Sequence, residues 1–160
     1  MHRRCTDSPP SRPRTAAPLA ARFALVVLQV PLPAGANPDA AAVIGTWKVL
    51  SHTVVFEGQT MDMHAALLQK RPCAAQIVYE VHADSTYRLN ASGSSCDEKY
   101  KSTQQKLYAK TRWKLEGDKF TTSATNFAVG QSYKVSVSGN RMTWVGTEGQ
   151  GTLILQKQSP

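Results

Sequence analysis

From Val43 onward, apolar and polar residues alternate with a period of two, and short turns interrupt the alternation. This is the pattern of strands that bury one face, because successive side chains of a strand point to opposite sides. Closely spaced strands with short turns indicate an antiparallel meander, and an even number of strands can close into a barrel. We therefore expect an all-β fold, an eight-stranded antiparallel up-and-down barrel. The predicted strands span residues 43–56, 76–82, 86–91, 109–115, 119–124, 131–137, 141–147 and 151–157.

The register of the hairpins follows from which residues must share the buried face. Val81 should oppose Tyr87, which requires a three-residue loop with Ser85 in the left-handed conformation that glycine would prefer. Two later hairpins should have two-residue turns that contain glycine. The pairs predicted for them are Leu115 with Phe120, Trp113 with Thr122, Val137 with Met142 and Val135 with Trp144.

Two segments depart from the alternation. Residues 60–71 have helical spacing, with Met63, Ala66 and Leu67 on one side, and they precede Pro72, which cannot continue a helix. We expect one short helical segment here, between the first and second strands, with an irregular loop as the alternative. Residues 97–110 are polar and rich in lysine, and they fit either a mobile loop or a short helix.

The N-terminal residues 1–36 have the features of a secretory signal. Arginines precede a short apolar stretch, residues 23–30 (FALVVLQV), and the small residues Ala34 and Ala36 follow at the spacing that signal peptidase recognises. A disordered leader is the alternative. Residues 37–160 would then form the folded domain, starting close to Asn37, in a secreted or periplasmic protein. No stretch reaches the ~18 apolar residues of a membrane-spanning helix.

Charge and cysteine content agree with export. Five of the 19 basic residues and one of the 11 acidic residues fall within residues 1–36, so the domain itself is only mildly basic. Two cysteines, Cys73 and Cys96, remain in the domain. In an oxidising compartment they would form one disulfide, and the predicted register brings them close together. Two free buried thiols, or metal ligands, are the alternatives.

Five segments of the sequence together resemble a known family. They are IGTWKVLSHTV, AALLQKRPC, IVYEVHADSTYRLNASGSSC, WKLEGDKFTT and GTLILQK, and they cover nearly all of residues 43–157. They resemble the small bacterial lipocalin-like domains, which are lipocalin/calycin-type β-barrels. Val81 departs from the usual Phe, and Ser85 from the usual turn glycine. The resemblance implies an exported barrel in which Gly45 and Trp47 form the closed end, with Lys157 the nearest candidate to cover Trp47.

No arrangement of residues indicates catalysis, so we expect a protein that is not an enzyme and needs no cofactor. His52 and His82 lie on the polar parity of their strands and should face solvent. Asp62 and His64 are too few ligands for a metal site. The lysine-rich stretch is better explained as a solvated segment than as a nucleic-acid surface, because export removes that partner.

The aromatic residues on the apolar parity suggest two functions. The first is a binding module for a small apolar or amphipathic molecule at the open mouth; the second is a protein-interaction or inhibitor module whose barrel is filled by its own side chains. A connected cavity above ~300 Å³ would favour the first. The sequence leaves the oligomeric state open, and we expect a monomer. The mouth residues predicted for the first function are Met61, Met63, Leu67 and Phe127, with Tyr79 and Tyr87 on the wall beneath.

Overall fold

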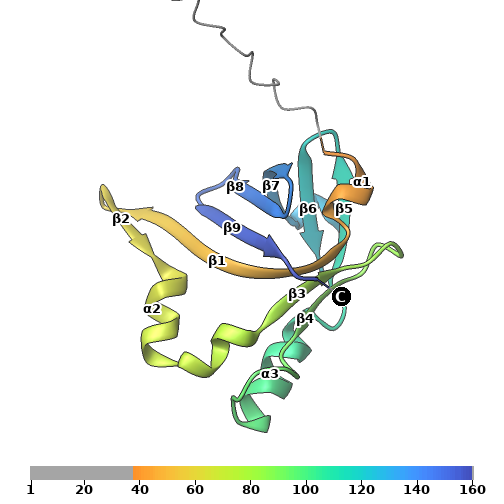
Figure 1. Ribbon diagram of the computed structural model, residues 1–160. Helices are drawn as coiled ribbons and strands as arrows, with labels where there is room; N and C mark the ends of the chain where they lie inside the picture. Colours follow the sequence, from red (N-terminus) through yellow and green to blue (C-terminus); the bar gives the residue numbers. More distant parts are fainter. Residues whose placement is uncertain (1–37, 160) are drawn as a thin grey trace, which may run out of the picture. The chain divides into compact units, whose positions relative to one another are not determined.

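The computed structural model describes residues 38–159, so the predicted signal segment lies outside the described residues. Over these described residues, the chain folds into an all-β barrel with three helices outside it (Figure 1). The strands are β1 (Gly45–Phe56), β2 (Gln59–Asp62), β3 (Val78–Val81), β4 (Tyr87–Asn90), β5 (Arg112–Glu116), β6 (Lys119–Ser123), β7 (Gln131–Ser138), β8 (Arg141–Gly146) and β9 (Thr152–Lys157). The helices are α1 (Ala40–Val43), α2 (Met63–Lys70) and α3 (Glu98–Tyr108), with short 3₁₀ turns η1 (Pro72–Gln76) and η2 (Phe127–Val129).

The barrel contains eight antiparallel strands in the order β4-β3-β1-β9-β8-β7-β6-β5, which is the predicted up-and-down topology. Strands β4 and β5 close the circle only at one corner, where Thr86 bridges Arg112 and the Tyr87 N–H donates to the Thr111 carbonyl at 3.0 Å. Beyond this corner the two strands separate. The barrel is therefore nearly closed, with a gap between β4 and β5 toward one end.

The predicted hairpin registers are confirmed. Val81 pairs with Tyr87, and Ser85 has a φ of 65° in the turn between them. The other four predicted cross-strand pairs are Leu115–Phe120, Trp113–Thr122, Val135–Trp144 and Val137–Met142, and all four are present. Alternation alone was enough here because a slip of one residue would have turned every apolar side chain of a strand outward.

One end of the barrel is closed around Trp47. Its indole Nε1 donates to the Val43 carbonyl at 2.8 Å, and the Lys157 Nζ lies 5.3 Å from the ring centroid. Gly45 has a φ of 141°, and a Cβ there would lie 2.7 Å from the Lys157 side chain, so glycine suits this position. The interior at this end is filled. The side chains of Trp47, Phe120, Met142 and Leu155 are at most 1% exposed.

Two boundaries of the sequence-based secondary structure need correction. The first strand begins at Gly45, because residues up to Val43 form helix α1, which Asp39 caps. Residues 59–62 form β2, which pairs with β1, so the helix expected from residue 60 begins only at Met63. Asp62 decides this start, since its carboxylate accepts hydrogen bonds from the backbone of His64 and Ala65.

The connection from β4 to β5 is a helix and not a mobile loop. Asp97 caps α3 by accepting from the Tyr100 N–H, and the Cys73–Cys96 disulfide ties the start of this connection to η1. The predicted disulfide is thereby confirmed. The expectation of one short helical segment therefore covered α2 and did not include α1 or the longer α3. Among residues 38–159, none of the helices combines the length and the apolar character that crossing a membrane requires.

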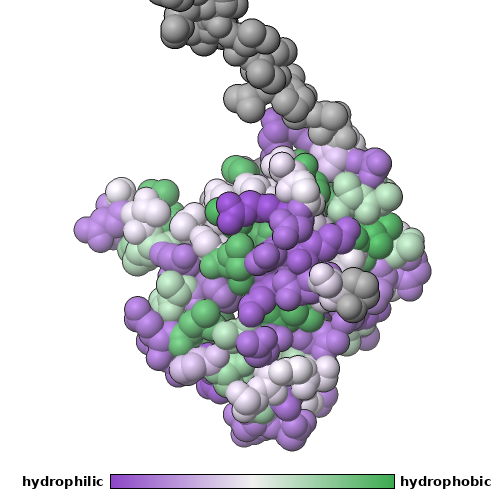
Figure 2. Space-filling model, in the orientation of Figure 1, coloured by the Kyte–Doolittle hydropathy of each residue, from purple (hydrophilic) through white to green (hydrophobic). Residues whose placement is uncertain are grey.

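The hairpin formed by β1 and β2 extends past the barrel (Figure 1). Its side chains are open to solvent, with Val55 72% and Phe56 62% exposed. Figure 2 shows that the visible surface is otherwise largely hydrophilic, with separated hydrophobic residues.

Candidate functional site

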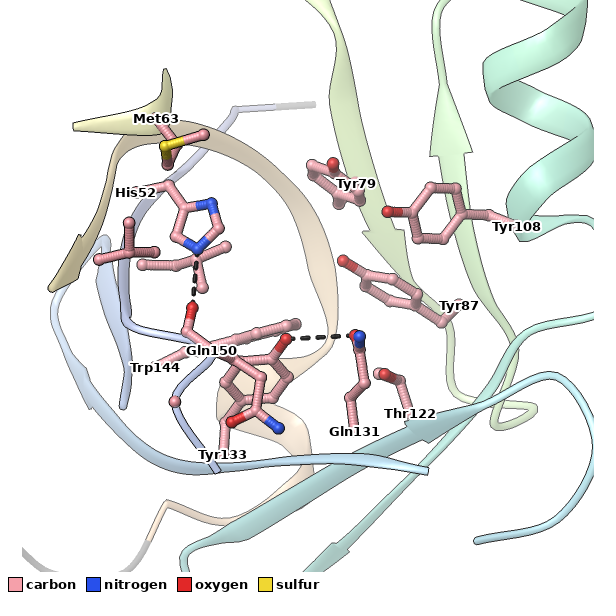
Figure 3. A pocket seen from close by; sticks show the side chains of 13 residues that line it. His52, Met63, Tyr79, Tyr87, Tyr108, Thr122, Gln131, Tyr133, Trp144 and Gln150 are labelled. Carbon is pink, nitrogen blue, oxygen red and sulfur yellow. Dashed lines mark hydrogen bonds between the residues drawn. The ribbon is translucent and has the colours of Figure 1, made fainter. Parts of the chain in front are cut away.

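The end of the barrel opposite Trp47 is hollow. A cavity of about 530 Å³ opens there (Figure 3). It lies between the strands and is bordered by the start of α2, the end of α3 and the β8–β9 loop. The lining residues are His52, Val54, Met63, Tyr79, Tyr87, Tyr108, Thr122, Gln131, Tyr133, Trp144, Gly149, Gln150 and Leu153.

His52 faces this cavity, and the expectation that it faces solvent on the outer surface is wrong. The pairing of β1 with β9 shifts between Val49 and Ser51, so Leu50 is an extra residue in a β-bulge. A bulge of one residue reverses the alternation that follows it. His52 and Val54 therefore point inward, although their parity matches the outer face of the first half of β1. His82 is exposed, as expected.

His52 also links the strand to the loop that borders the cavity. Its ring Nε2 lies 2.8 Å from the Gln150 carbonyl oxygen, in the loop between β8 and β9 (Figure 3). Gly151 in this loop has a φ of 79°, and a Cβ there would lie 2.1 Å from the Thr53 carbonyl oxygen. The loop thus passes so close to β1 that only glycine fits. Both contacts hold the loop beside the mouth.

Three tyrosines form one wall of the cavity. Tyr79 and Tyr87 are cross-strand neighbours whose rings stack, with centroids 5.6 Å apart and planes 10° from parallel. Tyr108, at the end of α3, packs edge-on against both, at 5.6 Å and 5.8 Å. In Figure 3 the three rings stand together on one side of the cavity. We call Tyr79, Tyr87 and Tyr108 the tyrosine cluster.

Burial raises the pKa of three tyrosines around the cavity. It raises the pKa of Tyr79 far above its ordinary value, and the neighbouring Tyr108 hydroxyl adds to the effect. Burial likewise raises the pKa of Tyr87 and, on the opposite wall, that of Tyr133. All three are therefore protonated at neutral pH and can donate hydrogen bonds.

The floor of the cavity is Trp144, which packs on Phe120 and Tyr133 with centroid distances of 4.6 Å and 5.1 Å. Its indole Nε1 is buried and has no hydrogen-bond partner among residues 38–159. The other two tryptophans differ in this respect, since Trp47 donates to the Val43 carbonyl and Trp113 to the His82 carbonyl. A buried N–H without a partner is costly and uncommon, so Trp144 is exceptional in this barrel.

The structure places some of the residues predicted for the mouth in the lining of the cavity and others outside it. Met63, Tyr79 and Tyr87 line the main cavity. Leu67 lines a small adjoining recess of about 120 Å³ that also includes Met63 and Tyr79. Met61 lies on β2 opposite Val54 and is 41% exposed, and it is not among the lining residues. Phe127 is also outside the lining; Lys114 Nζ lies 5.3 Å from its ring.

Two lining residues could have been found only with information beyond alternation. His52 requires knowledge of the bulge at Leu50. Tyr108 lies in the segment that fitted either a loop or a helix, but the spacing of Tyr100, Gln104 and Tyr108 places the three on one helical face. Tyr100 and Gln104 border a small recess on that side. Tyr133 and Trp144 were already predicted to face inward.

Within residues 38–159, no group of three or more His, Cys, Asp or Glu side chains comes close enough to hold a metal ion. Asp62, one of the two candidate ligands in the sequence, instead caps α2, and the backbone hydrogen bonds it accepts lower its pKa. Burial lowers the pKa of His64. The chemistry of the cavity is that of aromatic faces and neutral polar groups.

Comparison of the chain with protein families, with characterised proteins and with solved structures gives no match. The fold is therefore established by the eight antiparallel strands and their order, and the case for a function rests on the cavity itself.

Proposed function

We propose that this protein is an exported binding module, not an enzyme, and that a small apolar or amphipathic molecule occupies the open end of its barrel. The observation that carries the proposal is the cavity of about 530 Å³ above Trp144. Its volume is in the range of small-molecule sites, and its lining combines aromatic walls with a few polar groups.

Export is supported by two features that lie far apart in the chain. The sequence pattern of residues 1–36 is typical of a secretory signal. The Cys73–Cys96 disulfide fits an oxidising compartment, where such bonds persist. The resemblance to small lipocalin-like domains, which are exported barrels, points in the same direction and likewise belongs to the proposal.

The alternative, an interaction module with a filled barrel, has less support. Its premise is a packed interior, and only the half of the barrel around Trp47 is packed. The exposed Val55 and Phe56 offer a surface for contact with another protein, but a hairpin tip does not account for the hollow at the open end.

Two neighbouring residues of β1 provide a matched test. Val54 lines the cavity, whereas Val55 is 72% exposed on the outer face. The neutral fluorophore N-phenyl-1-naphthylamine is titrated into the parent, Val54→Trp and Val55→Trp proteins. We expect saturable binding to the parent, at least tenfold weaker binding to Val54→Trp, whose indole fills the cavity, and unchanged binding to Val55→Trp.

Circular dichroism and thermal unfolding of both variants ensure that a loss of binding is not a loss of fold. Absence of saturable binding by the parent would contradict the proposal. Equal binding by all three folded proteins would move the site away from the cavity.

A further inference from the structure

Uncharged hydroxyl and amide groups provide most of the polar lining of the cavity. The rings of the tyrosine cluster stand together on one side of the cavity (Figure 3), and burial raises the pKa of Tyr79 and of Tyr87. Their protonated hydroxyls can donate hydrogen bonds. A ligand that carries an acceptor can therefore gain hydrogen bonds from this side of the cavity.

Among residues 38–159, no Lys, Arg, Asp or Glu side chain lines the cavity. A carboxylate placed inside would therefore lose its hydration without gaining a cationic partner, and this desolvation is costly. A carbonyl oxygen loses much less on transfer from water. The site thus favours a neutral acceptor over an ionised one.

The shape of the walls favours a flat molecule. The stacked rings of Tyr79 and Tyr87 stand on one side, and Trp144 lies 6.0 Å from Tyr87 by ring centroid. Tyr133 borders the cavity next to Trp144. Aromatic faces in these positions gain most from a ligand ring that can pack flat or edge-on against them.

We infer that the cavity selects neutral, planar aromatic molecules with a carbonyl-type acceptor, which receives hydrogen bonds from the tyrosine cluster. This inference rests on the proposed function, since it names the class of ligand for the same cavity.

Three naphthalene derivatives of similar size test the inference by displacement of N-phenyl-1-naphthylamine. 2-Acetylnaphthalene carries the carbonyl, 2-ethylnaphthalene lacks an acceptor, and 2-naphthoate carries a charge at pH 7. We expect the ketone to bind about tenfold more tightly than the hydrocarbon, which corresponds to one or two net hydrogen bonds. We also expect it to bind at least tenfold more tightly than the carboxylate.

Two variants test whether the tyrosine hydroxyls cause the preference for the ketone. The double variant Tyr87→Phe, Tyr108→Phe keeps both rings and removes two donors, so it should lower the affinity for the ketone and leave that for 2-ethylnaphthalene unchanged. Tyr100→Phe is the control, because the Tyr100 ring packs under the Arg71 guanidinium, 4.0 Å from its centroid, outside the cavity lining. It should change neither affinity.

The possible results distinguish a failure of the inferred ligand class from a failure of the proposed binding function. If the parent binds the hydrocarbon as tightly as the ketone, or the carboxylate more tightly, the inference is overturned while the cavity remains a binding site. The same holds if the double variant keeps the full preference for the ketone. If neither the fluorophore nor any of the three compounds binds, the proposed function fails together with the inference.

Discussion

The two halves of the barrel interior are built from the same strands but differ in how tightly their side chains pack. Around Trp47 the side chains interlock, and Phe120 and Met142 are completely buried. Toward the other end the inward-pointing residues are also large, but a cavity of about 530 Å³ remains between the walls that they form. Large aromatic residues therefore fill one half of the barrel and line the other.

The tryptophans show what distinguishes the halves. Trp47 and Trp113 donate to backbone carbonyls at 2.8 Å and 2.9 Å in the filled half, so their hydrogen bonding is complete without a ligand. Trp144 borders the cavity, and its N–H has no partner among residues 38–159. The hydrogen bonding of the two tryptophans in the filled half is complete, and the buried Trp144 N–H beside the cavity is left without a partner among the same residues.

The largest difference between the halves should appear when side chains are truncated. Phe120→Ala removes a fully buried ring and should lower the free energy of unfolding by about 3–5 kcal/mol. Leu153→Ala removes a side chain that borders the cavity and should cost about 1–2 kcal/mol, because its surroundings are already partly open. Urea unfolding measures both values. Equal losses would mean that the open half is packed as tightly as the closed half.

The disulfide should matter nearly as much, because it anchors the chain on either side of the β3–β4 hairpin. The double variant Cys73→Ser, Cys96→Ser should lose about 3 kcal/mol, the value that the chain-entropy model gives for a loop of this length. Urea unfolding again provides the measurement. Thiol titration of the denatured, unreduced protein is the check on the premise: two reactive thiols per chain, in place of none, would refute the bridge.

A smaller effect separates two tryptophans of nearly equal burial. Trp113→Phe and Trp144→Phe remove the same volume, but the first loses a hydrogen bond and the second removes an N–H without a partner. Trp113→Phe should therefore be more destabilising by about 1–2 kcal/mol. Thermal unfolding of the ligand-free variants gives the comparison. A larger loss for Trp144→Phe would indicate that its N–H is satisfied in solution.

The tyrosine cluster predicts a weak dependence of stability on alkaline pH. The pKa of Tyr87 is raised in the folded protein by burial, so its contribution to stability is complete below the unfolded value of about 10 and declines as the pH rises above it. The expected slope for this one group is about 1.4 kcal/mol per pH unit. Urea unfolding between pH 9 and 11 should show a shallower decline for Tyr87→Phe than for the parent. Identical slopes would mean that Tyr87 ionises freely in the folded state.

Much of the barrel could be predicted from the sequence, because the buried face determines register. The pairing of Val81 with Tyr87 and the left-handed Ser85 both follow from alternation and turn geometry. Alternation fails where the chain adds a residue: the bulge at Leu50 leaves no mark in the pattern of apolar residues, so His52 was assigned to the wrong face.

The candidate site was less accessible to prediction, since it depends on where segments meet. Tyr108 belongs to a polar helix and reaches the cavity only because α3 returns to the barrel beside Tyr79 and Tyr87. Met61 and Met63 are both methionines of one short segment, and the sequence did not distinguish them. The pairing of β2 with β1 places Met61 on the hairpin that extends past the barrel. The volume of the cavity is a property of the assembled strands and cannot be obtained from any one of them.

The most direct test of the account uses the indole N–H signals of the three tryptophans in a ¹H–¹⁵N correlation spectrum. The signals are assigned by single Trp→Phe variants, and N-phenyl-1-naphthylamine is then added to the parent protein. We predict that the Trp144 signal shifts with saturation, because this residue forms the floor of the cavity, while the signals of Trp47 and Trp113 in the filled half stay in place. A shift of Trp47 or Trp113 with Trp144 unchanged, or no shift of any of the three, would contradict the assignment of binding to the open half.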